Sequence, residues 1–235
     1  MTAAMIAPRD HIPRAIVFDM DGVLIDSERL IRECWIAVGL KRGLPGIGEL
    51  FGQCLGVSYE GSRAKFTERY GTGVSYDGFR DEARARYLAL VREAIPVKHG
   101  VRGMLAWLRA EGWKIGLASS TQRESVLRSL RRTELITYFE AIICGDMVRA
   151  SKPEPDIYLA ACAALQEDPS RCYAVEDSKN GLISAHSAGM RTVLIPDLME
   201  PDEEMRRLAG AVFPDMAAFH QWLLHEDAAH GGSVR

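Results

Sequence analysis

The sequence predicts an α/β protein with a doubly wound parallel sheet in a three-layer sandwich and an α-helical domain inserted after the first strand. Two observations predict this fold. Short apolar runs alternate with segments of helical periodicity, which is the pattern of βαβ units in a parallel sheet. About a hundred residues separate the first apolar run from the second, far more than one crossover helix needs. The expected core is therefore Rossmann-like, and the long gap holds a second domain.

Five apolar runs are expected to form the strands, because buried parallel strands are apolar on both faces. Segments with apolar residues three or four positions apart lie between the later runs and predict crossover helices. An example is the segment containing Val101, Leu105 and Leu108, before the second run. The predicted strands are 15–18, 114–118, 141–144, 172–175 and 192–195.

The gap between the first two strands is expected to be a helical cap. Its clearest helix is Tyr76–Glu93, in which Phe79, Ala83, Tyr87 and Leu90 recur at helical spacing. Pro96 discourages the residue before it from continuing a helix, so we place one boundary there.

The predicted domains follow from these boundaries. They are a core of residues 1–27 and 96–235, with a cap of residues 28–95. The segment 225–235 has adjacent glycines and little apolar content, and is expected to be a disordered tail.

Composition limits the classes of partner. The 235-residue chain has a formal net charge of -3 and a pI near 6.1, so it offers no basic field for nucleic acid. No run approaches the ~18 apolar residues of a membrane span. The five cysteines are odd in number and show no Cys-x-x-Cys spacing, so neither a disulfide framework nor a zinc site is expected. These features favour a cytoplasmic protein with reduced cysteines that acts on a small molecule.

Polar residues follow the predicted strands where each strand ends. Residues i and i+2 of a strand share a face, and a turn at Gly22 can aim Asp19 and Asp21 at one point. In an open parallel sheet, ligands bind beyond the carboxyl ends of the strands. The polar groups are Asp19-Met20-Asp21-Gly22 after the first strand, Ser119-Ser120-Thr121 after the second, Lys152-Pro153 after the third and Glu176-Asp177-Ser178 after the fourth.

These four groups resemble, in the same order, the four motifs of the haloacid dehalogenase superfamily. The first one, residues 19–27, resembles that superfamily's first motif closely, and the resemblance covers about residues 15–195. Within the superfamily, the nearest branch is that of β-phosphoglucomutase-like proteins and sugar phosphatases with a helical cap. The resemblance implies a phosphoric monoester hydrolase that acts on a small phosphorylated metabolite such as a sugar phosphate.

The resemblance also implies a role for each residue. Asp19 is the nucleophile that becomes an aspartyl phosphate, and Asp21 is the general acid and base. Lys152, Ser119 and Ser120 are expected to bind the phosphoryl group.

The expected cofactor is Mg²⁺, which prefers carboxylate, phosphate and water oxygens. Its implied ligands are Asp19, the backbone carbonyl of Asp21, and Asp177. Glu176 is either another ligand or a hydrogen-bond acceptor in the outer shell.

Each of these residues also has a simpler interpretation. Lys152 alone would be read as an exposed loop lysine. Ser119 could be the N-cap of the next helix, a role that is compatible with phosphate binding at the same helix end. Glu176 and Asp177 could form only a turn, although four clustered carboxylates would repel one another without a cation.

Two cap positions bear on the choice between phosphatase and phosphomutase. The mutase pattern carries a histidine where this chain has Ile31, and an arginine where it has Tyr59. Without that arginine, the bidentate grip on a second phosphate is lost, which favours a phosphatase. Asp21 argues against the dehalogenases, and Lys65 is the only lysine in the cap interior to consider for a phosphonate hydrolase.

A more distant alternative is a phosphoacceptor signalling module, because receiver domains also combine strand-end aspartates, a hydroxyl residue and a lysine. The large cap and the adjacent Asp21 argue against it. Specificity is expected to come chiefly from residues 43–65.

Overall fold

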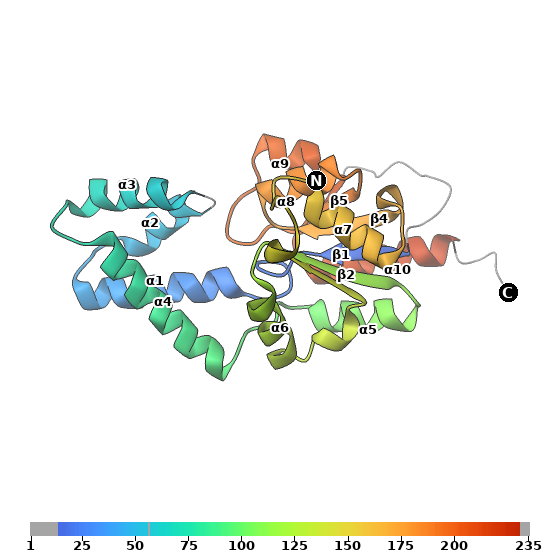
Figure 1. The fold of residues 1–235 in the computed structure, drawn as a ribbon, viewed down its shortest axis with the longest axis horizontal. Helices are drawn as coiled ribbons and strands as arrows, with labels where there is room; N and C mark the ends of the chain where they lie inside the picture. Colours follow the sequence, from blue (N-terminus) through green and yellow to red (C-terminus); the bar gives the residue numbers. More distant parts are fainter. Residues whose placement is uncertain (1–13, 56, 231–235) are drawn as a thin grey trace. The chain divides into compact units, whose positions relative to one another are not determined.

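The computed structural model describes residues 14–55 and 57–230. Within them, six strands form one parallel sheet in the order β3-β2-β1-β4-β5-β6 (Figure 1). The strands are β1 Ala15–Phe18, β2 Lys114–Ser119, β3 Ala141–Cys144, β4 Cys172–Glu176, β5 Arg191–Leu194 and β6 Ala211–Val212.

This strand order is that of a doubly wound sheet, and the predicted fold class is confirmed. The chain adds β2 and β3 on one side of β1, and then returns to add β4, β5 and β6 on the other side. The switch point, where doubly wound proteins bind their ligands, therefore lies between β1 and β4.

The five predicted strands are present, with differences of one residue at their ends. Strands β2 and β4 each include one polar residue beyond the apolar run, because Ser119 pairs with Cys144 and Glu176 pairs with Leu194. The prediction missed β6, which is too short to carry a periodic pattern.

Helices cover both faces of the sheet (Figure 1). On one face, Val17 and Ala174 share a buried cluster with Ile157 and Cys162 of helix α7. Tyr173 points to the opposite face, since neighbouring residues of a strand alternate, and its ring contacts Phe219 of α10. The helices of this part are α5 Val101–Ala110, α6 Arg123–Arg132, α7 Asp156–Leu165, α8 Lys179–Ser187, α9 Glu203–Leu208 and α10 Met216–His230.

The C-terminal segment differs from the prediction. Helix α10 continues to His230, so the expectation of a disordered tail is wrong for residues 225–230, and residues 231–235 lie outside the described part. Its apolar side chains Phe219 and Leu223 are buried, and Asp227 forms an ion pair with Arg14 at 3.0 Å. This packing holds a helix in a segment whose composition alone gives no sign of one.

The chain divides into two compact units. The α/β unit comprises residues 1–25 and 96–235, and the helical unit comprises Asp26–Ile95. In the described part of the helical unit, four helices enclose an aromatic cluster in which the ring of Phe79 lies 5.1 Å from both Trp35 and Phe66. The helices are α1 Ser27–Arg42, α2 Ile47–Cys54, α3 Tyr59–Tyr70 and α4 Tyr76–Glu93.

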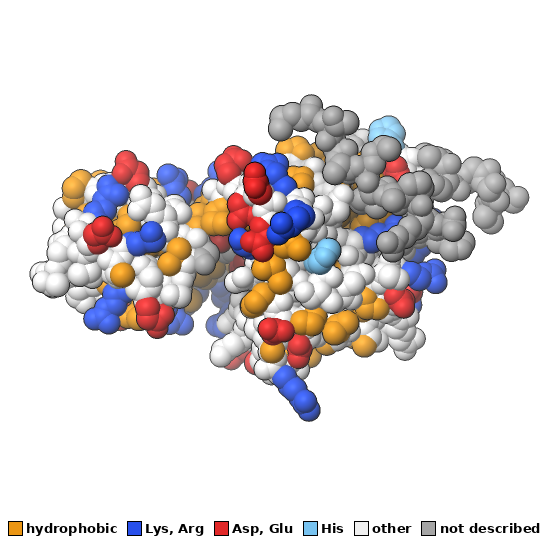
Figure 2. Space-filling view, turned by 90° about the horizontal axis from the view of Figure 1, so that it is seen from above, with side chains coloured by type: hydrophobic (Ala, Val, Ile, Leu, Met, Phe, Trp, Pro, Cys, Tyr) orange, Lys and Arg blue, Asp and Glu red, His pale blue; other side chains and the backbone are white. Residues whose placement is uncertain are grey.

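The surface carries both signs of charge. On the face drawn in Figure 2, acidic and basic side chains are interspersed within each unit. Among the described helices, none is both long enough and apolar enough to cross a membrane. All five cysteines are free thiols, and each except Cys54 is buried.

Candidate active site

The ends of β1 and β4 bring the predicted acidic residues together. Asp19 follows the last residue of β1, and its N–H donates to the carbonyl of Val175 in β4 at 3.0 Å. Glu176 is the last residue of β4. In these parallel strands Phe18 pairs with Val175, so Asp19 and Glu176 leave the sheet side by side at the switch point.

Lys152 lies inside this group and is not an exposed loop lysine, so that interpretation is wrong. Its side chain is only 6% exposed. The ammonium donates to Asp19 Oδ1 at 2.5 Å and to Glu176 Oε1 at 2.6 Å. It also donates to the carbonyl of Ala118 at 2.9 Å, so all three of its N–H donors have acceptors.

Glu176 is completely buried, and donors surround both of its carboxylate oxygens. Oε1 accepts from Lys152 and, at 2.7 Å, from the hydroxyl of Tyr158. Oε2 accepts from the Ser178 hydroxyl at 3.0 Å and from the N–H of Asp177 at 3.2 Å. Its acceptor positions are therefore filled by protein donors, and Glu176 is the last residue of a buried strand rather than part of a turn.

Two glycines allow the carboxylates to sit this close to the backbone. A Cβ at Gly22 would lie 2.0 Å from Asp177 Oδ2, and a Cβ at Gly181 would lie 1.9 Å from Glu176 Oε1. Gly22 also has φ +80, in the left-handed region that favours glycine. Any side chain at either position would displace an acidic residue of the site.

The site holds two buried carboxylates, those of Asp19 and Glu176, against the one ammonium of Lys152. Burial raises the pKa of Asp19 to about 8, although Lys152 acts to lower it. Burial alone would lower the pKa of Lys152, but attraction to Asp19 and Glu176 raises it above its usual value. Lys152 thus stays an ammonium, and a further cation beside Asp19 would favour the ionised carboxylate.

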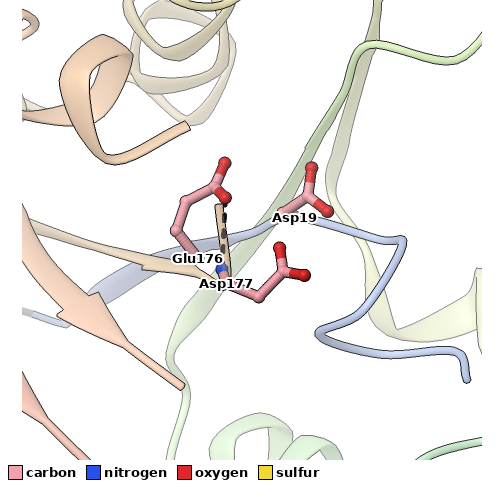
Figure 3. A group of neighbouring side chains, drawn as sticks. All are labelled: Asp19, Glu176 and Asp177. Atoms are coloured by element: carbon pink, nitrogen blue, oxygen red, sulfur yellow. Dashed lines mark hydrogen bonds between the residues drawn. The ribbon is translucent and has the colours of Figure 1, made fainter. Parts of the chain in front are cut away.

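An acidic cluster marks a place for such a cation. Carboxylate oxygens of Asp19, Glu176 and Asp177 lie within 4.8 Å of one another (Figure 3). Because Glu176 is occupied by donors, the oxygens of Asp19 and Asp177 fit a metal ion best. The absence of a side chain at Gly22 leaves room for the Asp177 carboxylate, so the residues present can accommodate a hard divalent cation.

Asp21 lies at the edge of this group and is partly buried. Its Oδ2 accepts a hydrogen bond from the hydroxyl of Thr121 at 3.2 Å. Thr121 follows β2, so the second polar group of the sequence contacts the first one through this pair. This hydrogen bond helps to orient the Asp21 carboxylate.

Of the two serines that the sequence assigns to the phosphoryl group, Ser119 is buried and Ser120 is exposed. Ser119 is buried at the end of β2, and its Oγ accepts from the N–H of Thr121 at 3.2 Å. Ser120 is exposed, and its Oγ accepts from the Ser151 hydroxyl at 2.9 Å. The structure thus separates the two hydroxyls, with Ser119 inside the strand end and Ser120 paired to the loop that carries Lys152.

Ser119 is not a helix cap, so that interpretation is also wrong. Helix α6 begins at Arg123 and its N-cap residue is Gln122. The side chain of Asp146 accepts the N–H of Arg123 at 2.9 Å. A carboxylate of the protein therefore already lies at the N-terminus of this helix, and phosphate binding at that helix end is not supported.

The sequence patterns assigned no role to two residues that contact the site, Thr121 and Tyr158. Thr121 is the third hydroxyl residue of the Ser-Ser-Thr group at the end of β2, and this position could have indicated that it contacts the site. Tyr158 lies in the first turn of the largely apolar helix α7 and has the pattern of a core residue, so only the fold reveals its contact with Glu176.

The fold and this arrangement define a class of protein, and comparison with known proteins agrees. Residues 13–189 match the sequence model of the haloacid dehalogenase-like hydrolases. The chain belongs to this family, and it is a phosphoric monoester hydrolase. Membership of a hydrolase family also argues against the signalling module.

Relatives with different activities are similar to the chain to almost the same degree. A phosphorylated carbohydrates phosphatase of Thermotoga maritima is 32% identical over 76% of this chain and 83% of its own length. A β-phosphoglucomutase of Bacillus subtilis is 30% identical over 77% of this chain and 82% of its own. The structure of a HAD family hydrolase from Deinococcus radiodurans R1, with bound phosphate and sodium, has a TM-score of 0.80 and 29% identity, covering 94% of this chain and 98% of that one.

Proposed function

We propose that this protein is a magnesium-dependent phosphatase that hydrolyses a small phosphorylated metabolite, in particular a sugar phosphate, through an aspartyl phosphate. The observation that carries the proposal is the buried ammonium of Lys152, held between Asp19 and Glu176. An ammonium in this place can neutralise phosphoryl oxygens next to a carboxylate nucleophile. The phosphatase named among the relatives supports the sugar phosphate substrate.

The residues divide the reaction into two steps. In the first, a carboxylate oxygen of Asp19 forms a bond to phosphorus, the ester P–O bond breaks, and Asp21 gives its proton to the leaving oxygen. In the second, Asp21 takes a proton from water, the water oxygen attacks phosphorus, and the bond to Asp19 breaks. Inorganic phosphate leaves and both carboxyl groups return to their starting states.

Binding and orientation are assigned to the remaining residues. Lys152 is assigned to neutralise the phosphoryl oxygens, and the hydroxyls of Ser119 and Ser120 are assigned to donate to them. Asp19, the carbonyl of Asp21, and Asp177 would hold Mg²⁺, which supplies charge neutralisation of the nucleophile and the phosphoryl group when bound. Glu176 is better suited to holding Lys152 than to binding the metal, because protein donors occupy both of its oxygens.

Hydrolysis is favoured over phosphate transfer between sugar positions by Tyr59. Its hydroxyl donates to Asp77, and the guanidinium of Arg80 lies 5.0 Å from the centre of its ring. This hydroxyl offers one donor, already used, where the mutase pattern has the planar donor fork of an arginine. A cap that binds a second phosphate weakly favours hydrolysis of the aspartyl phosphate by water.

The experiment that tests the proposal replaces the nucleophile. Asp19→Asn keeps the size of the side chain but removes its charge, and we expect the turnover of any phosphate ester to fall by ~10³-fold or more. Asp21→Ala is the comparison: it should retain more activity on an aryl phosphate, whose leaving group needs no proton, than on a sugar phosphate. If folded Asp19→Asn kept more than a few per cent of activity, Asp19 would not be the nucleophile.

A further inference from the structure

We propose that Tyr158 is a positioning residue for catalysis, whose hydroxyl fixes Glu176 and thereby the ammonium of Lys152. The proposal rests on the proposed function, because it assumes that Lys152 acts on the phosphoryl group. Tyr158 itself does not reach the reacting atoms. It lies in the first turn of α7, and its side chain is fully buried.

Tyr158 contacts the catalytic group in two ways. Its hydroxyl donates to Glu176 Oε1 at 2.7 Å, the same oxygen that accepts from Lys152 at 2.6 Å. Its ring lies beside the ammonium, with Lys152 Nζ 5.0 Å from the ring centre, within the range of a cation–π interaction. Tyr158 therefore supports Lys152 both through Glu176 and through its own ring.

The hydroxyl determines how well Glu176 is fixed. Ser178 and the Asp177 N–H hold Oε2, whereas Oε1 is held only by side chains, Lys152 and Tyr158, in the described structure. Without the hydroxyl, a buried acceptor position of Glu176 stays unfilled. Lys152 is then the one remaining side-chain donor to Oε1 among the described residues, and it is drawn toward Glu176 and away from Asp19.

Movement of the Lys152 ammonium away from Asp19 raises the free energy of the transition state more than it weakens substrate binding. The ammonium must stay next to Asp19 to neutralise the phosphoryl oxygens as the bond to phosphorus forms. A displacement of this charge lowers kcat, whereas the rest of the substrate keeps its contacts and KM changes little.

The test is Tyr158→Phe, which keeps the ring and removes one oxygen. We expect kcat to fall about 10-fold with KM changed less than about 2-fold. The inhibition constant for orthovanadate, which takes the five-coordinate geometry of phosphoryl transfer, should rise about 10-fold. The matched control is Thr192→Val, which removes another buried hydroxyl of the sheet, bonded to the carbonyl of Leu208, away from the described site. It should lower stability and leave both readouts unchanged.

A second measurement tests the route through Glu176. In a Glu176→Gln background, Tyr158→Phe should add little further loss of kcat, because the two changes affect one contact. Full additivity, or an unchanged vanadate constant in folded Tyr158→Phe, overturns the proposal. If Tyr158→Phe does not fold, Tyr158→Met, which also lacks the hydroxyl, is measured in the same way. Failure of the proposed function itself is recognised separately, by activity that survives Asp19→Asn.

Discussion

The two units hold their polar residues in different ways. In the α/β unit, Lys152 is 6% exposed and has three acceptors, and Glu176 is buried with donors on both oxygens. In the helical unit, Tyr59 is 37% exposed, and its partners Asp77 and Arg80 are exposed as well. A buried charged group must be paired, so its surroundings reveal its role, whereas an exposed group is solvated and can serve many ligands. The chemistry can therefore be inferred from this molecule more closely than its substrate.

The largest loss of turnover should come from removing the metal ion, which depends on the carboxylates of the α/β unit and not on the helical unit. Four carboxylates of the α/β unit, those of Asp19, Asp21, Glu176 and Asp177, accompany the ammonium of Lys152, so chelation should abolish turnover and Mg²⁺ should restore it. Ca²⁺ should restore little activity, because its larger and looser ligand shell misplaces the nucleophile. The measurement is phosphate release in EDTA followed by titration with each cation. Full activity in excess chelator would remove the metal from the mechanism.

A smaller effect should come from the glycine that lets α8 approach Glu176. Gly181→Ala would place a methyl group 1.9 Å from the Glu176 carboxylate, so we expect a loss of about 1–3 kcal/mol of stability together with a lower kcat. Gly103→Ala is the control, because Gly103 is also helical but a Cβ at that position would meet no atom within 4 Å in the described structure. It should be neutral or stabilising by up to about 1 kcal/mol. Thermal unfolding and kcat are measured on both, and equal behaviour would show that the close contact at Gly181 has no consequence.

The smallest effect on chemistry should come from the helical unit. Tyr59→Phe removes an exposed hydroxyl, so stability should change by less than about 1 kcal/mol. Turnover of a small aryl phosphate should stay within about 2-fold, while relative kcat/KM across a panel of sugar phosphates should change about 3-fold or more. Tyr70→Phe is the matched control in the same helix, since its hydroxyl donates to the carbonyl of Pro45 at 2.9 Å. If Tyr59→Phe and the control gave the same substrate profile as the unaltered protein, Tyr59 would have no part in specificity.

The sheet was predictable because its strands are apolar runs, and buried parallel strands require such runs. The positions of Asp19 and Glu176 were predictable because strand ends meet at one edge of a parallel sheet, and Lys152 was expected near them from its place in the loop after the third strand. The contacts between them were not predictable. A lysine in a loop is usually exposed, and only the fold shows that Lys152 is buried between two carboxylates. Tyr158 gave no signal at all, because an aromatic residue in an apolar helix has the pattern of a core residue.

The C-terminal helix and Ser119 show two further limits of the sequence. Helix α10 is stabilised by the packing of Phe219 and Leu223. The segment 225–235 that follows them is mostly polar and contains adjacent glycines, so its composition gives no sign of the helix. The N-cap interpretation of Ser119 failed because three residues separate it from the first residue of α6. For α10, tertiary contacts rather than local propensity decide the outcome.

The measurement that tests the central claim most directly supplies β-glucose 1-phosphate with Mg²⁺ and a bisphosphate activator, and follows inorganic phosphate and glucose 6-phosphate together. A mutase must protect its aspartyl phosphate from water while a bisphosphate intermediate reorients, and this requires a firm grip on the distal phosphate. At the position where the mutase pattern has an arginine, this chain has Tyr59, whose single hydroxyl already donates to Asp77. We therefore expect phosphate release without detectable glucose 6-phosphate. Formation of glucose 6-phosphate faster than release of phosphate would contradict the phosphatase and assign the chain to the phosphomutases.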